Sequence, residues 1–216
     1  MLYNVAMNVV NYLKETYGYS VPIFLRDIRI GRKSKTAIRK ELSRAVKKGE
    51  IVRKSNGVYC FKEENSYIDG VTFEAIIEQK YIKDDFGFPG LDVVNTFGYY
   101  TGLTFQNYIG ISTQVPAVIE IVTNKTSCKR IVTINGRKAI IKKPKAEINY
   151  NNYKILQFLD LINSLDNDEI REHSSILYQY IRNNFIRKNL DDYLDLYPLK
   201  VYYLLLYGGL LNAFRL

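Results

Sequence analysis

Polar and apolar positions alternate with a helical period from residue 34 to residue 48, and this segment predicts the best-defined helix of the chain. Its apolar residues recur every three to four positions and share one side of the expected helix: Ile38, Leu42, Ala45 and Val46. Ser34 precedes this pattern as a predicted N-cap, and Gly49 follows it where a left-handed residue normally ends a helix. A helix with one apolar and one polar side is therefore expected here.

The flanking segments predict a small domain around this helix. Apolar residues at helical spacing predict a first helix from Leu2 to Gly18, and Pro22 predicts the start of a second, short helix that carries Ile23, Phe24 and Ile28. After Gly49, two β-branched runs flank Asn56-Gly57, which favours a hairpin turn. Three helices and a hairpin are typical of a winged helix-turn-helix, so we predict such a domain over residues 1–66.

The remaining residues, 67–216, predict an α+β domain. Thr72 caps an expected helix, a β-branched run at Val115–Val122 predicts a strand, and Asn135-Gly136 predicts a hairpin. The last third is helical, with one helix beginning near Pro198 and its apolar run Val201–Leu211 expected to be buried. We predict a small antiparallel sheet followed by a layer of C-terminal helices.

Charge separates the two predicted domains. Residues 1–62 contain 14 Lys and Arg and four Asp and Glu, a net charge of +10, whereas the rest of the chain has a net charge of −1. The whole formal excess of +9 therefore lies in the predicted winged helix. Such an asymmetry is typical of a domain that binds phosphates, although a single basic helix is usually only a solvated face.

The predicted helix at 34–48 is the candidate reader of DNA. Its N-terminal and outer residues would contact base edges in the major groove: Lys35, Thr36, Arg39, Lys40 and Ser43. Arg39 is the best candidate for a bidentate contact with guanine. Other cations would hold phosphates: Arg32, Lys33, Arg44, Lys47, Arg53 and Lys54. Arg53, Lys54 and Asn56 at the hairpin tip could reach the minor groove, whereas Tyr59 is expected to pack inside.

A second basic patch follows in the α+β domain, and no acidic residue interrupts it. It comprises Lys125, Lys129, Arg130, Arg137, Lys138, Lys142, Lys143 and Lys145. Three interpretations are open: a further nucleic-acid surface, a surface that acts on a toxin or its RNA target, or a strand edge protected from aggregation by its charges.

The sequence contains little that predicts an enzyme. His173 is the only histidine and belongs to no catalytic motif, and neither a phosphate-binding loop nor a dinucleotide-binding glycine pattern is present. Cys60 and Cys128 lie far apart without metal-ligand spacing. We therefore expect no catalytic residues, no metal and no cofactor. No signal peptide or membrane span is predicted, so we expect a cytoplasmic protein, monomeric in solution and pairing on DNA.

One stretch resembles a known family. Residues 101–124 resemble the signature of AbiEi-type antitoxins of bacterial abortive-infection (type IV) toxin–antitoxin systems, in which a short helix leads to a turn and then a strand. The corresponding residues are Gly110, Ile111, Ser112, Thr113, Gln114, Val115, Pro116, Thr123 and Asn124. The run from Leu42 to Ile51 is similar to the winged helix of that family. The resemblance covers about residues 1–145.

The resemblance implies an autorepressor that binds inverted repeats of double-stranded DNA upstream of its own gene. It also implies an antitoxin that counteracts a nucleotidyltransferase-like toxin without forming a stable complex, as part of phage defence. Two alternatives stay open: a stand-alone winged-helix transcriptional regulator, and an adaptor that binds nucleic acid or protein without operator specificity.

Overall fold

The structure is a computed structural model that describes residues 8–63, 70–84, 95–134 and 136–214. The fold is mixed α+β, with nine α-helices and three β-sheets among these residues. The chain divides into two compact units, Met1–Gln79 with Ile134–Gly136, and Lys80–Thr133 with Arg137–Leu216. The domain boundary that we predicted between residues 66 and 67 lies outside the described residues.

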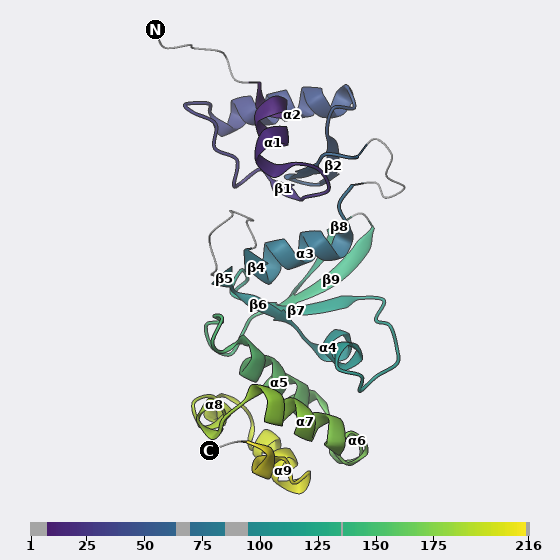
Figure 1. Ribbon diagram of the computed structural model, residues 1–216, viewed down its shortest axis with the longest axis vertical. Coiled ribbons are helices and arrows are strands. Elements are labelled where there is room, and N and C mark those ends of the chain that lie inside the picture. Colours follow the sequence, from purple (N-terminus) through teal and green to yellow (C-terminus); the bar gives the residue numbers. More distant parts are fainter. Residues whose placement is uncertain (1–7, 64–69, 85–94, 135, 215–216) are drawn as a thin grey trace. The chain divides into compact units, whose positions relative to one another are not determined.

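The N-terminal unit combines two helices with a three-stranded antiparallel sheet (Figure 1). Its elements up to residue 63 are α1 (Val9–Tyr17), β1 (Ile23–Phe24), α2 (Lys35–Lys47), β2 (Val52–Ser55) and β3 (Val58–Cys60). The strands are ordered β1-β3-β2, and the apolar sides of both helices enter one core with residues of the sheet. The predicted first helix is confirmed from Val9 onward, and the hairpin around Asn56-Gly57 is also confirmed.

The predicted second helix is wrong. Ile23 and Phe24 form β1, and Ile23 pairs with Tyr59 and Phe24 with Val58. A turn follows, in which the Asp27 N–H donates to the Phe24 carbonyl. Pro22 therefore precedes a strand and not a helix, because pairing with a strand far along the chain outweighs the local helix-start signal.

One helix links the two units along the chain. Helix α3 (Phe73–Tyr81) begins after Thr72, whose hydroxyl accepts from the Ala75 N–H, as the sequence predicts for a cap. Strand β4 (Lys83–Asp84) follows and pairs antiparallel with β5 (Asn95–Thr96).

The second unit contains a four-stranded sheet of order β6-β7-β9-β8. Its strands are β6 (Gly98–Tyr100), β7 (Ile119–Thr123), β8 (Arg130–Ile134) and β9 (Arg137–Lys142). We predicted a small antiparallel sheet here, and the sheet is mixed, because β7 runs antiparallel to β6 but parallel to β9. Both strands that flank the predicted turn at Asn135-Gly136 are present, whereas Asn135 itself lies outside the described residues.

Close backbone packing at β6 requires a glycine. A Cβ atom on Gly98 would lie 2.0 Å from the Tyr81 carbonyl oxygen and 2.8 Å from the Val122 carbonyl oxygen. Only a residue without a side chain lets the neighbouring backbone approach this closely. Gly98 thus fixes the position of β6 against both neighbours.

The C-terminal helices gather on one side of this sheet (Figure 1). The helices of this unit are α4 (Gly102–Tyr108), α5 (Tyr153–Ser164), α6 (Asn167–Glu172), α7 (Ser174–Asn184), α8 (Arg187–Asp191) and α9 (Leu199–Tyr207), with short 3-10 turns at Leu194–Leu196 and Leu210–Ala213. Phe158 of α5 is fully buried and stacks against Tyr180, at the centre of an aromatic core that also contains Phe185 and Phe214.

Two sequence predictions need adjustment in this unit. The helix near Pro198 is confirmed as α9, but it is only half buried, because Val201, Leu204 and Leu205 enter the core while Leu206 is exposed. The strand predicted at Val115–Val122 is shorter, since β7 begins at Ile119. Apolar residues occur all around α9, so the sequence did not show that only one side of this helix packs into the core.

Candidate nucleic-acid interface

Helix α2 has well-defined ends. The Ser34 hydroxyl accepts from the Ala37 N–H at 3.2 Å, which satisfies one otherwise unpaired donor of the first turn. At the other end Gly49 has a φ of +75°, and two hydrogen bonds close the helix, from Gly49 N–H to the Val46 carbonyl and from Glu50 N–H to the Ala45 carbonyl. This pattern is a Schellman motif, so both predicted caps are confirmed.

The inner side of α2 holds the helix in place. Ile38, Leu42 and Ala45 are buried in the core of the N-terminal unit together with Val9 and Leu13 of α1. Burial of these aliphatic side chains stabilises the unit by roughly 1.5–3 kcal/mol for each large one. The packing fixes the rotation of the helix about its axis and leaves its opposite side in solvent.

The outer side of α2 is cationic and carries hydroxyl groups. It consists of exposed residues at the spacing of one helix face: Thr36, Arg39, Lys40, Ser43 and Lys47. None of these five side chains forms a hydrogen bond or an ion pair with another residue that the structure describes. Their donors are therefore available to a ligand, and no residue that the structure describes neutralises their positive charges.

The other predicted contact residues near α2 divide into two groups. Arg32 and Arg44 are exposed, and their guanidinium groups have no partner among the described residues. By contrast, the Lys33 ammonium lies 2.8 Å from a Glu41 carboxylate oxygen, and the Lys35 ammonium donates to the Arg26 carbonyl at 2.6 Å. Lys33 and Lys35 thus help to hold the start of α2 within the unit.

The β2–β3 hairpin positions the remaining predicted residues. Arg53 donates to the Ser55 carbonyl and to the Asn56 side-chain oxygen, so two of the three predicted tip residues contact each other. Lys54 is half-buried. Tyr59 is buried between β1 and β2, as predicted for a packing residue. The hairpin therefore presents Arg53 and Asn56 as one ordered group.

The second basic patch is partly used by the fold of its own unit. The Lys125 ammonium lies 4.2 Å from the centre of the Phe97 ring, and Lys145 lies 4.8 Å from the centre of the Tyr197 ring. Lys142 forms an ion pair with Glu120. The exposed residues without a partner among the described part of the chain are Lys129, Arg130, Lys138 and Lys143. Arg137 is also exposed.

Lys142 and Lys145 affect the pKa of one carboxyl group, that of Asp160. The Tyr99 hydroxyl donates to Asp160 at 2.8 Å, and burial raises the pKa of the Asp160 carboxyl. The hydrogen bond from Tyr99, the neighbouring Tyr197 hydroxyl and the charges of Lys145 and Lys142 oppose that rise in the Asp160 pKa. Burial, followed by the charge of Asp160, also raises the pKa of both tyrosine hydroxyls. The hydrogen bond from Tyr99 of β6 to Asp160 of α5 joins the sheet to this helix.

Two of the residues that resemble the antitoxin signature, Thr123 and Asn124, have structural roles here. Thr123, fully buried, accepts the Lys125 N–H and donates to the Phe97 carbonyl. The Asn124 side chain donates to the Ile148 carbonyl at 2.8 Å and accepts from the Ile148 N–H at 3.0 Å. Both residues therefore fasten the end of β7 to the segments beside it.

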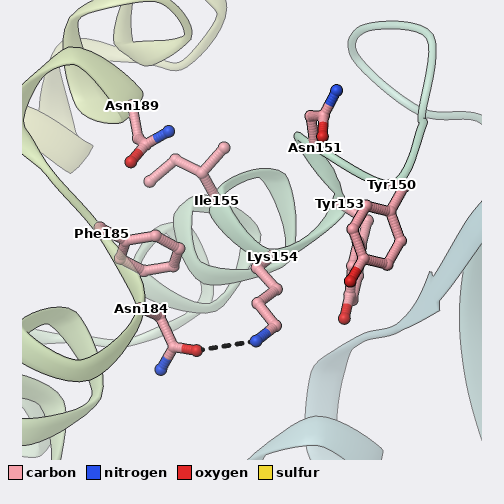
Figure 2. Close-up of a pocket in the computed structure, with 8 residues that line it drawn as sticks. All are labelled: Tyr150, Asn151, Tyr153, Lys154, Ile155, Asn184, Phe185 and Asn189. Carbon is pink, nitrogen blue, oxygen red and sulfur yellow. Dashed lines mark hydrogen bonds between the residues drawn. The ribbon is translucent and has the colours of Figure 1, made fainter.

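The sequence analysis did not single out a polar pocket of about 260 Å³ at the start of α5 (Figure 2). Its lining residues are Tyr150, Asn151, Tyr153, Lys154, Ile155, Asn184, Phe185 and Asn189. These residues come from three segments that the fold brings together: residues 150–155 at the start of α5, residues 184–185 at the end of α7, and Asn189 in α8. The run Asn149–Asn152 was the one available signal in the sequence.

The chain matches no protein-family model, no curated protein and no solved structure. Within the described residues, no three His, Cys, Asp or Glu side chains come together as a metal-binding group. None of the helices that the structure describes is long and apolar enough to cross a membrane.

Proposed function

We propose that this protein is a sequence-specific DNA-binding repressor that reads its operator with the outer side of α2. The observation that carries the proposal is the row of exposed, unpartnered cations and hydroxyls between two firm helix caps. Cations without a counter-charge among the described residues repel one another along the helix, at Lys40 and Arg44 for example, and phosphates would relieve that repulsion.

The proposal includes a winged helix-turn-helix mode of binding. Its support is the order of elements, since α2 packs on α1 and is followed directly by the β2–β3 hairpin, which would act as the wing. The segment Ile23–Asp27 forms a strand and a turn in place of the usual middle helix. The recognition helix would therefore be supported by β1 and the turn after it.

Within this proposal the residues take different roles. Arg39 would make a bidentate contact with guanine, and Thr36, Lys40 and Ser43 would contact neighbouring base edges. Arg32, Arg44 and Lys47 would bind phosphates, which fix the register of the helix on the duplex. Lys33 and Lys35 already have partners in the unit, so we assign them a positioning role. Arg53 and Asn56 would approach the minor groove.

We extend the proposal to an antitoxin on the strength of the resemblance alone. The protein would repress its own operon by binding inverted repeats and would counteract a nucleotidyltransferase-like toxin encoded beside it. Expression of the neighbouring gene in a bacterial host, with and without the full chain, tests this part. Rescue of growth by the full chain would support it, and growth arrest in both cultures would contradict it.

Fluorescence anisotropy tests the DNA-binding proposal. The full chain is titrated into the duplex from upstream of its own gene and into a scrambled duplex of equal composition. We expect the upstream duplex to bind at least about a thousandfold more tightly, as specific complexes do, and Arg39→Ala to remove most of that preference. Equal, weak binding to both duplexes would contradict the proposal.

A further inference from the structure

The pocket at the start of α5 contains unused hydrogen-bond donors. Asn152 is the residue before the helix, but its side chain does not cap it, because it accepts from the Asn149 N–H and donates to the Glu147 carbonyl. The N–H groups of Lys154 and Ile155 consequently have no acceptor among the described residues. Both residues line the pocket, at the positive end of the helix dipole.

The side chain of Lys154 also lines the pocket and forms no ion pair with a residue that the structure describes. The Lys154 ammonium donates to the Asn184 side-chain oxygen at 3.0 Å, and the amide of Asn184 is itself oriented by a hydrogen bond to the Tyr180 carbonyl. An amide oxygen holds the ammonium in place without cancelling its charge. None of the described residues that line the pocket is acidic, so its polar part favours an anion.

Tyrosine rings form one side of the pocket. Figure 2 shows the rings of Tyr150 and Tyr153 beside each other, across the pocket from Asn189. Their centres are 6.3 Å apart, and Tyr150 is 65% exposed, so one face of its ring is open to a ligand. An exposed tyrosine next to a cation is the combination on which nucleobases stack.

The size of the pocket limits what can enter. Its volume of about 260 Å³ lies just below the usual range for sites that enclose a whole drug-sized molecule, roughly 300–1,000 Å³. A phosphate with its sugar fits this volume, while a planar base would stay outside on the Tyr150 ring. Asn151 and Asn189 also line the pocket, and side-chain amides can bind sugar or base oxygens.

We propose that this pocket binds one nucleotide, with its phosphate at the start of α5 beside Lys154 and its base stacked on Tyr150. The nucleotide would be either a free molecule or the end of a single strand. The proposal uses no residue of α2 and is independent of operator binding.

Backbone amide chemical shifts of the full chain, followed during a titration with adenosine 5′-monophosphate, test the proposal. We expect saturating shifts for residues 150–155 and 184–189. Lys154→Met should weaken binding at least about tenfold, and Tyr150→Ala about tenfold, while inorganic phosphate should bind Tyr150→Ala as it binds the wild type. Tyr150 is exposed and Lys154 lies on the helix surface, so both variants should fold.

Three matched variants serve as controls. Tyr178→Ala removes another exposed tyrosine, Lys143→Met removes another exposed lysine, and Arg39→Ala removes a proposed DNA contact. All three should bind adenosine 5′-monophosphate as the wild type does. The absence of shifts at the pocket up to about 10 mM, or equal affinity in Lys154→Met and the wild type, would overturn the proposal.

A single-stranded tetranucleotide distinguishes the two sources of the ligand. Binding at least about tenfold tighter than the mononucleotide, still dependent on Lys154 and Tyr150, would identify the end of a strand. Equal affinity, with the same dependence on these two residues, would identify a free nucleotide. Tight binding of the tetranucleotide that survives both substitutions would place it elsewhere and overturn the proposal.

Discussion

The two basic regions of this protein use their charges differently. On α2 the cations of the outer side are exposed and have no partner among the described residues. In the second basic patch, Lys142 is paired with Glu120, while Lys125 and Lys145 lie over aromatic rings. Lys142 and Lys145 also oppose the rise in the Asp160 pKa. The cations of the first region are therefore available to bind a ligand, whereas several cations of the second region interact with other side chains of the protein.

A count of lysines and arginines along the sequence does not show this difference. Both regions appear as basic runs almost free of acidic residues, and both would be read as nucleic-acid surfaces by composition. The partner of each cation in the folded chain separates them. The comparison predicts that changes on α2 alter binding and that changes at the paired lysines alter stability.

The largest effect should come from the combined variant Arg39→Ala, Lys40→Ala and Lys47→Ala. Its affinity for the upstream duplex should fall by about a hundredfold or more, because one arginine–guanine contact alone contributes about 1–3 kcal/mol, and the lost base contact of Lys40 and phosphate contact of Lys47 add to it. Its melting temperature should stay at the wild-type value or rise, because repulsion along α2 is removed. Anisotropy and circular dichroism measure the two quantities. Unchanged affinity of this variant for the upstream duplex would contradict the proposed difference between the two basic regions.

Asn124→Ala should destabilise the protein by about 1–2 kcal/mol, since it removes two hydrogen bonds to the Ile148 backbone. Denaturant unfolding measures this change, with Asn183→Ala as a matched exposed control that should be neutral. The folded variant should still bind the upstream duplex with wild-type affinity. A stable Asn124→Ala variant that no longer binds DNA would show that this end of β7 serves binding instead.

Neutralising one lysine of the second basic patch should produce a smaller change. Lys142→Ala leaves the Glu120 carboxylate half-buried without its counter-charge and should cost about 1 kcal/mol. Its neighbour Lys143 is exposed and has no partner among the described residues, so Lys143→Ala should leave stability unchanged. Equal unfolding free energies for the two variants would show that the Lys142–Glu120 pair contributes nothing to the fold.

The smallest expected effect is a dependence on pH. Burial raises the Asp160 pKa above its ordinary value of 3.8 in the folded protein, so folding stability from this group is present below that value and is lost as the pH rises through the folded pKa. Asp160→Asn keeps an acceptor for the Tyr99 hydroxyl and should remove this loss. Urea unfolding from pH 3 upward measures it. A wild-type protein that gains stability over the variant as the pH rises would contradict the assigned shift.

Local patterns predicted the elements that depend on neighbours in sequence. The apolar spacing of Ile38 and Leu42, the Ser34 cap and the Gly49 stop place α2 within one residue of its actual bounds. The hairpin at Asn56-Gly57 has an equally local cause. Helices and tight turns can be predicted in this way because their hydrogen bonds join residues a few positions apart.

Pairings and sites that depend on distant partners were not predicted. Strand β1 exists because Ile23 pairs with Tyr59. Ile121 pairs in parallel with Ile141, which joins β7 to β9 although β8 lies between them in the sequence. The pocket at α5 needs residues from three segments. The contacts of Lys142 with Glu120 and of Lys145 with the Tyr197 ring could not be predicted for the same reason, because both partners lie far from the lysines in the sequence.

The salt dependence of affinity for the upstream duplex tests the central claim most directly. It is compared among the wild type, the α2 triple variant, and a variant of the second basic patch with Lys129, Arg130, Lys138 and Lys143 each changed to Ala. We predict that the slope of log affinity against log salt falls in magnitude by about 0.9 in the α2 variant, which loses the phosphate contact assigned to Lys47, and keeps its wild-type value in the patch variant. A slope lost in the patch variant and kept in the α2 variant would contradict the account.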